Sequence, residues 1–82
     1  MGQNELIHEV KKFLAQQFPA TKNIGDSDPL LEGGLIDSLG ILDVVTFLEN
    51  QFGVTIADED LSPENFATVR SIAEFVSQKK SL

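Results

Sequence analysis

The sequence contains no cysteine, no tryptophan and no tyrosine. Without cysteine the chain can form neither a disulfide nor a thiolate metal site, so any thiol in its chemistry must come from another molecule. Bases are also scarce, with six lysines and arginines against thirteen acids. No apolar run approaches the roughly 20 residues of a membrane span, and the N-terminus lacks the bases of a secretory signal. We therefore expect a cytoplasmic protein that does not insert into a membrane.

The length of 82 residues predicts one domain, residues 1–82, with one hydrophobic core. Hydrophobic residues make up 41% of the sequence, which is enough for the core of a small domain without a disulfide or a structural metal. The net charge of −7 opposes self-association. We therefore expect a monomer.

The bases lie only near the two ends of the chain. Three lysines precede residue 23, and one arginine and two lysines follow residue 69. Such a charge pattern repels nucleic acid and anionic lipid and attracts basic protein patches, although it also suits a surface that only maintains solubility. The stretch between the bases carries ten acids with no base to screen them: Asp26, Asp28, Glu32, Asp37, Asp43, Glu49, Asp58, Glu59, Asp60 and Glu64.

The spacing of apolar residues predicts two amphipathic helices in the first two thirds of the chain. Residues 4–18 carry apolar side chains three and four positions apart, with Asn4 as the predicted N-cap. Residues 38–52 carry a second such stripe, with Asp37 as N-cap and Gly53 at the C-terminal end. Apolar residues cover more than one face of this second helix, so we expect one side of it to contact another molecule.

Residues 19–36 are predicted to form a long loop between these helices, held against the core by its aliphatic residues. Residues 54–56 alternate like a short strand but have no partner strand, so we predict a loop there as well. One short helical turn is predicted around residues 62–65, and the last helix starts after Thr68 as its cap. The predicted fold class is all-α.

No group of residues in the sequence is suited to catalysis. His8 is the only imidazole, and its charged neighbours on the first helix predict that it faces solvent. Residues 26–28 and 58–60 are acidic but lack the ligand spacing of a calcium loop, and the glycines at 33–34 lack the following Lys-Ser/Thr of a phosphate loop. We therefore expect no enzymatic activity, no catalytic residue and no metal site.

Residues 34–39, Gly-Leu-Ile-Asp-Ser-Leu, resemble the attachment motif of the acyl and peptidyl carrier protein family. The resemblance covers essentially the whole chain and includes Asp-Pro-Leu-Leu-Glu-Gly-Gly at 28–34, Phe-Gly-Val-Thr-Ile at 52–56 and Phe-Ala-Thr-Val at 66–69. It implies a four-helix bundle of three main helices and one short helix. It also implies a carrier that holds acyl or aminoacyl groups as thioesters on a 4′-phosphopantetheine arm attached covalently to Ser38.

The resemblance further implies how the arm is attached and which proteins use it. A separate phosphopantetheinyl transferase takes the arm from coenzyme A, and Asp37 and Leu39 flank the attachment point. Ligases, synthases and transferases for acyl or aminoacyl groups then bind the helix after the serine through basic patches. The positions carried over as partner-binding are Asp37, Leu39, Leu42, Asp43, Glu49, Asp58, Glu59 and Asp60. Leu42 could equally belong to the core.

Three features depart from the carriers of fatty acid synthesis. Gly40 stands where those proteins usually have an acid, Phe47 is bulkier than its usual counterpart, and residues 61–66 form a longer stretch. The departures favour a specialised carrier of amino acids, short acyl groups or secondary-metabolite intermediates. Phe47 is hypothesised to narrow the space between the helices, so that a long acyl chain is poorly sheltered.

Two other functions stay open from the residues alone. The chain could be an acidic helical adaptor for a basic partner, in which Ser38 only helps to start a helix. It could also be a signalling domain in which Ser38 receives phosphate, since a phosphoserine at a helix start is electrostatically favourable.

Overall fold

The computed structural model describes residues 2–80, without the side chains of Gln3 and Ser38. This part of the chain forms three α-helices with two short 3₁₀ helices between them, so the prediction of an all-α fold is confirmed. The elements in chain order are α1 (Gln3–Gln17), η1 (Pro19–Thr21), α2 (Ser38–Phe52), η2 (Asp58–Asp60) and α3 (Val69–Lys80).

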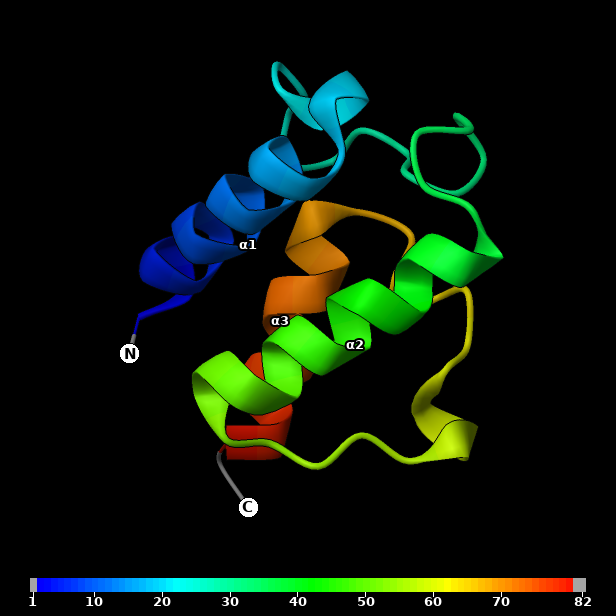
Figure 1. Ribbon diagram of the computed structural model, residues 1–82. Helices are drawn as coiled ribbons and strands as arrows, with labels where there is room; N and C mark the ends of the chain where they lie inside the picture. The colour runs from blue at the N-terminus through cyan, green and yellow to red at the C-terminus, as the bar shows by residue number, and fades with distance from the viewer. Residues whose placement is uncertain (1, 81–82) are drawn as a thin grey trace.

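Helices α1 and α2 both pack against α3. Figure 1 shows α3 behind and between the other two, and α3 is in contact with both α1 and α2. The long loop after α1 passes over one end of the bundle to reach the start of α2, and the segment after α2 returns alongside it (Figure 1). The start of α2 therefore lies between two connecting segments at one edge of the molecule.

The core forms where the apolar stripes of the helices meet. Val10 and Leu14 of α1, together with Val44 and Leu48 of α2, are fully buried. Four residues of α3 join them, and burial of such side chains is the main favourable contribution to folding. The α3 residues are Val69, Ile72, Ala73 and Val76.

The loop between α1 and α2 is held to the core, as predicted. The Leu30 side chain is fully buried, and the Leu30 amide donates to the Ala67 carbonyl oxygen at 2.8 Å. The Arg70 amide donates to the Asp26 carbonyl oxygen at 3.0 Å. Both bonds join the loop to the residues around the start of α3, so the loop has a defined path over the bundle.

Three of the four predicted helix ends are confirmed. The Asp37 carboxylate accepts the Gly40 amide at 2.7 Å, and the Thr68 hydroxyl accepts the Ser71 amide at 3.0 Å. Gly53 ends α2 with φ of 68°, a left-handed conformation that favours glycine. The prediction of Asn4 as N-cap is wrong, because α1 already begins at Gln3 and Gly2 is its N-cap.

The short turn predicted around residues 62–65 is present as hydrogen-bonded turns that do not form a helix. A short 3₁₀ helix that the sequence did not predict, η2, lies just before it at Asp58–Asp60. The Asp60 carboxylate accepts the Ala57 amide at 3.0 Å and pairs with Lys79 of α3. A contact from a distant helix thus stabilises this turn, whereas residues 54–56 lie outside regular structure, as predicted.

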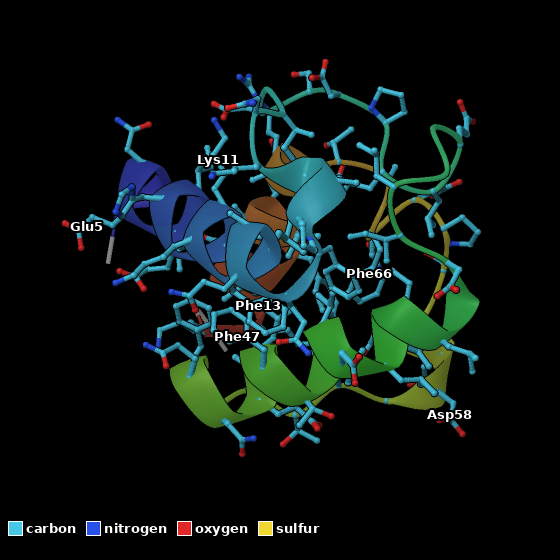
Figure 2. The ribbon with its side chains drawn as sticks, turned by 45° about the horizontal axis from the view of Figure 1, so that its top comes forward. Glu5, Lys11, Phe13, Phe47, Asp58 and Phe66 are labelled. Atoms are coloured by element: carbon cyan, nitrogen blue, oxygen red, sulfur yellow. The ribbon has the colours of Figure 1, made fainter. Side chains whose placement is uncertain are left out.

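Four phenylalanine rings form an aromatic seam between α1 and α2: Phe18, Phe13, Phe47 and Phe52. The Phe13 and Phe47 rings stack with their centroids 4.0 Å apart (Figure 2). Phe18 meets Phe13 edge-on at 6.5 Å, and Phe52 meets Phe47 edge-on at 5.9 Å. The backbones of α1 and α2 make few close contacts, so the rings of the seam bridge the space between these helices.

We expect Phe47→Ala to lower the free energy of unfolding by about 2 kcal/mol, because it removes a half-buried ring and its stack on Phe13. Urea unfolding measures this change. Phe13→Ala should cost about 1 kcal/mol less in the Phe47→Ala background than in the wild type. Leu39→Ala on the exposed start of α2 is the control and should shift stability by under about 0.5 kcal/mol. Additive costs for the two rings would contradict a direct contribution of the stack.

Candidate functional site

The first turn of α2 begins at Ser38 and is capped by the residue before it. Asp37 has an extended backbone, and its carboxylate accepts the Gly40 amide at 2.7 Å. The remaining amides of a first helical turn have no partner within the helix, and this end carries the positive side of the helix dipole. Asp37 and Leu39, the two neighbours of Ser38, are both exposed. The turn can therefore accept an anion and is open to another protein.

Gly40 lies on the inner side of this turn and is buried. A Cβ atom at this position would lie 2.8 Å from Cγ2 of Ile36 and 3.0 Å from Cε1 of Phe18. The Phe18 ring thus occupies the space that a side chain at Gly40 would need. The absence of an acid here, seen in the sequence as a missing charge, is a packing requirement of this chain.

The outer face of α2 carries two large exposed apolar side chains. Leu39 is 74% exposed and Leu42 is 53% exposed. The alternative placement of Leu42 in the core is therefore wrong. An exposed apolar pair beside a serine at a helix start provides a surface on which an apolar part of a partner can be buried.

A hollow of about 220 Å³ lies between α2 and the segment that follows η2. Phe66 is almost fully buried and contributes to its inner wall. Sequence reasoning missed this hollow, because its walls come from three separate segments whose meeting no local pattern predicts. It is lined by Leu31, Ile41, Leu42, Leu61, Ser62, Pro63 and Phe66. Phe47 is not among the lining residues, since its ring lies in the aromatic seam instead.

The acids predicted to bind partners fall into two groups in the structure. Asp43, Asp58 and Glu59 are exposed. Glu49 is half-buried, and its Oε2 accepts the Ile56 amide at 3.1 Å, which holds the segment after α2. Asp60 is likewise bonded within the protein. Sequence position alone could not separate these two groups.

Asp60 and Asp26 are paired with bases from distant parts of the chain. Lys79 Nζ lies 2.7 Å from Oδ2 of Asp60, and Lys11 pairs with Asp26. The hydrogen bond from Lys79 and that from the Ala57 amide lower the pKa of Asp60 below its ordinary value. The expectation that no base screens the central acids is therefore wrong for these two.

Residues 2–80, which the structure describes, offer neither a metal site nor a membrane span. His8 is exposed on α1, and no three His, Cys, Asp or Glu side chains of this range gather as metal ligands would. None of the helices in the same range combines the length and the apolar character needed to cross a bilayer.

Comparison with known proteins decides the family. Residues 5–76 match the family model described as "Phosphopantetheine attachment site". The chain belongs to this family. The predicted role as a carrier of acyl or aminoacyl groups and the predicted covalent cofactor, 4′-phosphopantetheine, are thereby confirmed.

The curated proteins similar to this chain include carriers with different names. The chain is 40% identical over 53 residues to the probable acyl carrier protein PigG of a Serratia species, a match that covers 65% of this chain and 61% of that protein. It is 30% identical over 80 residues to the acyl carrier protein of Thermosynechococcus vestitus, covering 96% of each. It is 23% identical over 77 residues to the D-alanyl carrier protein of Streptococcus mutans, covering 94% of this chain and 98% of that protein.

The first turn of α2 fits the group that defines the phosphopantetheine attachment family. A phosphodiester is an anion, and the uncapped amides and dipole of a helix N-terminus favour an anion. Asp37 directs its carboxylate to the Gly40 amide, and Gly40 packs inward against Phe18. The outer side of the turn, with Asp37 and Leu39, is exposed.

We expect Gly40→Ala to destabilise the protein by about 1–3 kcal/mol, although alanine favours a helix more than glycine does. The reason is that the added methyl group overlaps Ile36 and the Phe18 ring. Thermal or urea unfolding measures the change. The substitution should cost less in a Phe18→Ala background, where the ring is absent. A stabilising Gly40→Ala would contradict the close approach.

Proposed function

We propose that Ser38 carries the 4′-phosphopantetheine arm and that the chain presents thioester-bound cargo to partner enzymes without catalysing a reaction itself. The observation that carries this proposal is the position of Ser38. It is the first residue of a capped helix whose outer neighbours are exposed, in a chain of the phosphopantetheine attachment family. The arm ends in a thiol, which this cysteine-free chain lacks.

The surface around the start of α2 supports docking of partner enzymes with basic patches. Asp43, Asp58 and Glu59 are exposed and supply the negative charge, while Leu39 and Leu42 supply an apolar contact. Asp37 takes part in this surface while also capping α2. Glu49 and Asp60 mainly hold the segment after α2 in place, because both accept hydrogen bonds from its backbone amides. The partners are a phosphopantetheinyl transferase and the ligases, synthases or transferases that load and unload the arm.

The cargo belongs to a specialised pathway rather than to bulk fatty acid synthesis. The relatives include proteins named as acyl carrier and as D-alanyl carrier, so both acyl and aminoacyl groups are candidates. Packing of Phe18 on Gly40 excludes an acid from the first turn of α2, so a partner that requires a charge at that point would bind poorly. We place this carrier in the cytoplasm as a monomer, consistent with its net charge of −7.

Incubation with coenzyme A, magnesium and a broad-specificity phosphopantetheinyl transferase should raise the intact mass by one phosphopantetheine group. Ser38→Ala should abolish this increase and remain folded, with a stability change of no more than about 1 kcal/mol. Intact-mass spectrometry and circular dichroism measure the two results.

The same experiment separates the alternatives. An acidic adaptor would gain no mass under any of these conditions. A phosphoserine switch would gain mass only with a kinase and ATP. A mass increase on folded Ser38→Ala would place the arm on another residue.

The rate of arm attachment should fall as salt is added, because exposed acids draw the transferase to the carrier. Asp43→Asn and Asp58→Asn should each lower kcat/KM of the transferase about two- to fivefold at low salt. Glu5→Gln is the matched control, since it removes one exposed acid from α1, on the opposite side of the molecule from Asp58 (Figure 2). Equal effects of all three substitutions, or a rate independent of salt, would count against docking at α2 and residues 58–59.

A further inference from the structure

Asp60 joins three separate segments of the chain. Its Oδ2 accepts the Ala57 amide at 3.0 Å and lies 2.7 Å from Lys79 Nζ on the last turn of α3. Its backbone oxygen accepts the Asn65 side-chain amide at 2.8 Å. One residue therefore holds the turn before it, the segment after it and the end of α3 together.

The segment held by Asp60 is a wall of the hollow beside α2. Leu61, Ser62, Pro63 and Phe66 line the hollow on this side, and Ile41 and Leu42 line it on the α2 side. The 3₁₀ turn at Asp58–Asp60 has no buried residue, so few apolar contacts fix it to the core. The position of this turn, and of the wall residues directly after it, thus depends strongly on the polar contacts of Asp60, whereas the buried Phe66 anchors the far end of the wall in the core.

The Lys79–Asp60 pair lies within reach of an approaching partner. The side chains of Lys79 and Asp60 are 27% and 20% exposed, and Asp58 and Glu59 directly beside them are exposed. Lys79 is also held over the Phe75 ring, with Nζ 5.7 Å from its centroid. An ion pair this close to solvent is weak, so a second cation can compete for the carboxylate.

We propose that the Lys79–Asp60 ion pair is a latch that a basic group of a docking partner opens. Asp58 and Glu59 attract a lysine or arginine of the partner, which then forms an ion pair with the Asp60 carboxylate and repels the Lys79 ammonium. The turn at Asp58–Asp60 then separates from α3, and the part of the wall that directly follows it loosens. A docking partner thereby changes the hollow next to the first turns of α2. The identity of the opener rests on the proposed function, whereas the latch itself does not.

Hydrogen exchange on the apo chain, residues 1–82, tests the latch. Lys79→Met removes the ammonium but keeps a long side chain, and it should speed exchange of the backbone amides of Ala57, Leu61 and Asn65 by roughly threefold or more. Lys79→Arg should restore slow exchange. Lys11→Met is the matched control because it breaks the other ion pair, with Asp26, and it should leave these three amides unchanged. Unchanged exchange in Lys79→Met would overturn the proposal.

A hexa-arginine peptide tests the opening by a partner. Titration of the wild type should speed exchange of the same three amides, and Asp58→Asn with Glu59→Gln should weaken this response. Lys79→Met should respond less than the wild type, because its latch is already open. A wild type that binds the peptide with no change in these amides would refute the opening step. Neither experiment needs the arm, so the latch can fail while the mass assay succeeds, and the reverse.

Discussion

Ile36 and the Phe18 ring pack so closely on Gly40 that no side chain fits there, and this close approach constrains the first turn of α2, where the proposed attachment site lies. The ring belongs to the aromatic seam, which spans the space between α1 and α2. Because a Cβ at Gly40 has no room, the inner side of the turn is closed and its outer side, with Leu39, faces solvent. The inner side of this turn is thus closed by packing, and the residues on either side of Ser38 are exposed to solvent.

The acidic stretch of the sequence is not one uniform surface in the folded protein. Asp37 caps α2, Glu49 holds the backbone at Ile56, and Asp60 holds the turn before it while pairing with α3. These acids stabilise the chain near α2. Backbone amides lose hydrogen bonds to water on folding, and a carboxylate that accepts from them offsets that cost. The exposed acids that accept none of these bonds, including Asp43, contribute to the negative electrostatic field around the protein. Glu49 and Asp60 thus serve mainly the local structure, Asp43 remains free at the surface, and Asp37 is exposed while it also caps α2.

Features set by neighbours in sequence could be predicted, and those set by distant contacts could not. The helices follow from apolar spacing, and Asp37 and Gly53 work as caps because their roles involve only residues within one turn. The ion pair between Asp60 and Lys79 joins residues far apart in the sequence, and the 3₁₀ turn at Asp58–Asp60 that it supports was not predicted. The hollow arises where Leu31 meets Phe66 and α2, which no periodicity reveals. The assignment of the arm to Ser38 rests on a resemblance, since a serine at a helix start is by itself an ordinary feature.

A carrier must meet several enzymes in turn, so each of its contacts has to be weak enough to release. Exposed carboxylates such as Asp58 suit this requirement, because they speed encounter through the field while contributing little to the lifetime of a complex. A latch made of one partly exposed ion pair follows the same logic. If Lys79 and Asp60 were fully buried, breaking the pair would leave an unpaired charge without water, and no transient partner could open it. Because both side chains are partly exposed, a weakly bound partner can replace the Lys79 ammonium at the Asp60 carboxylate with a cation of its own.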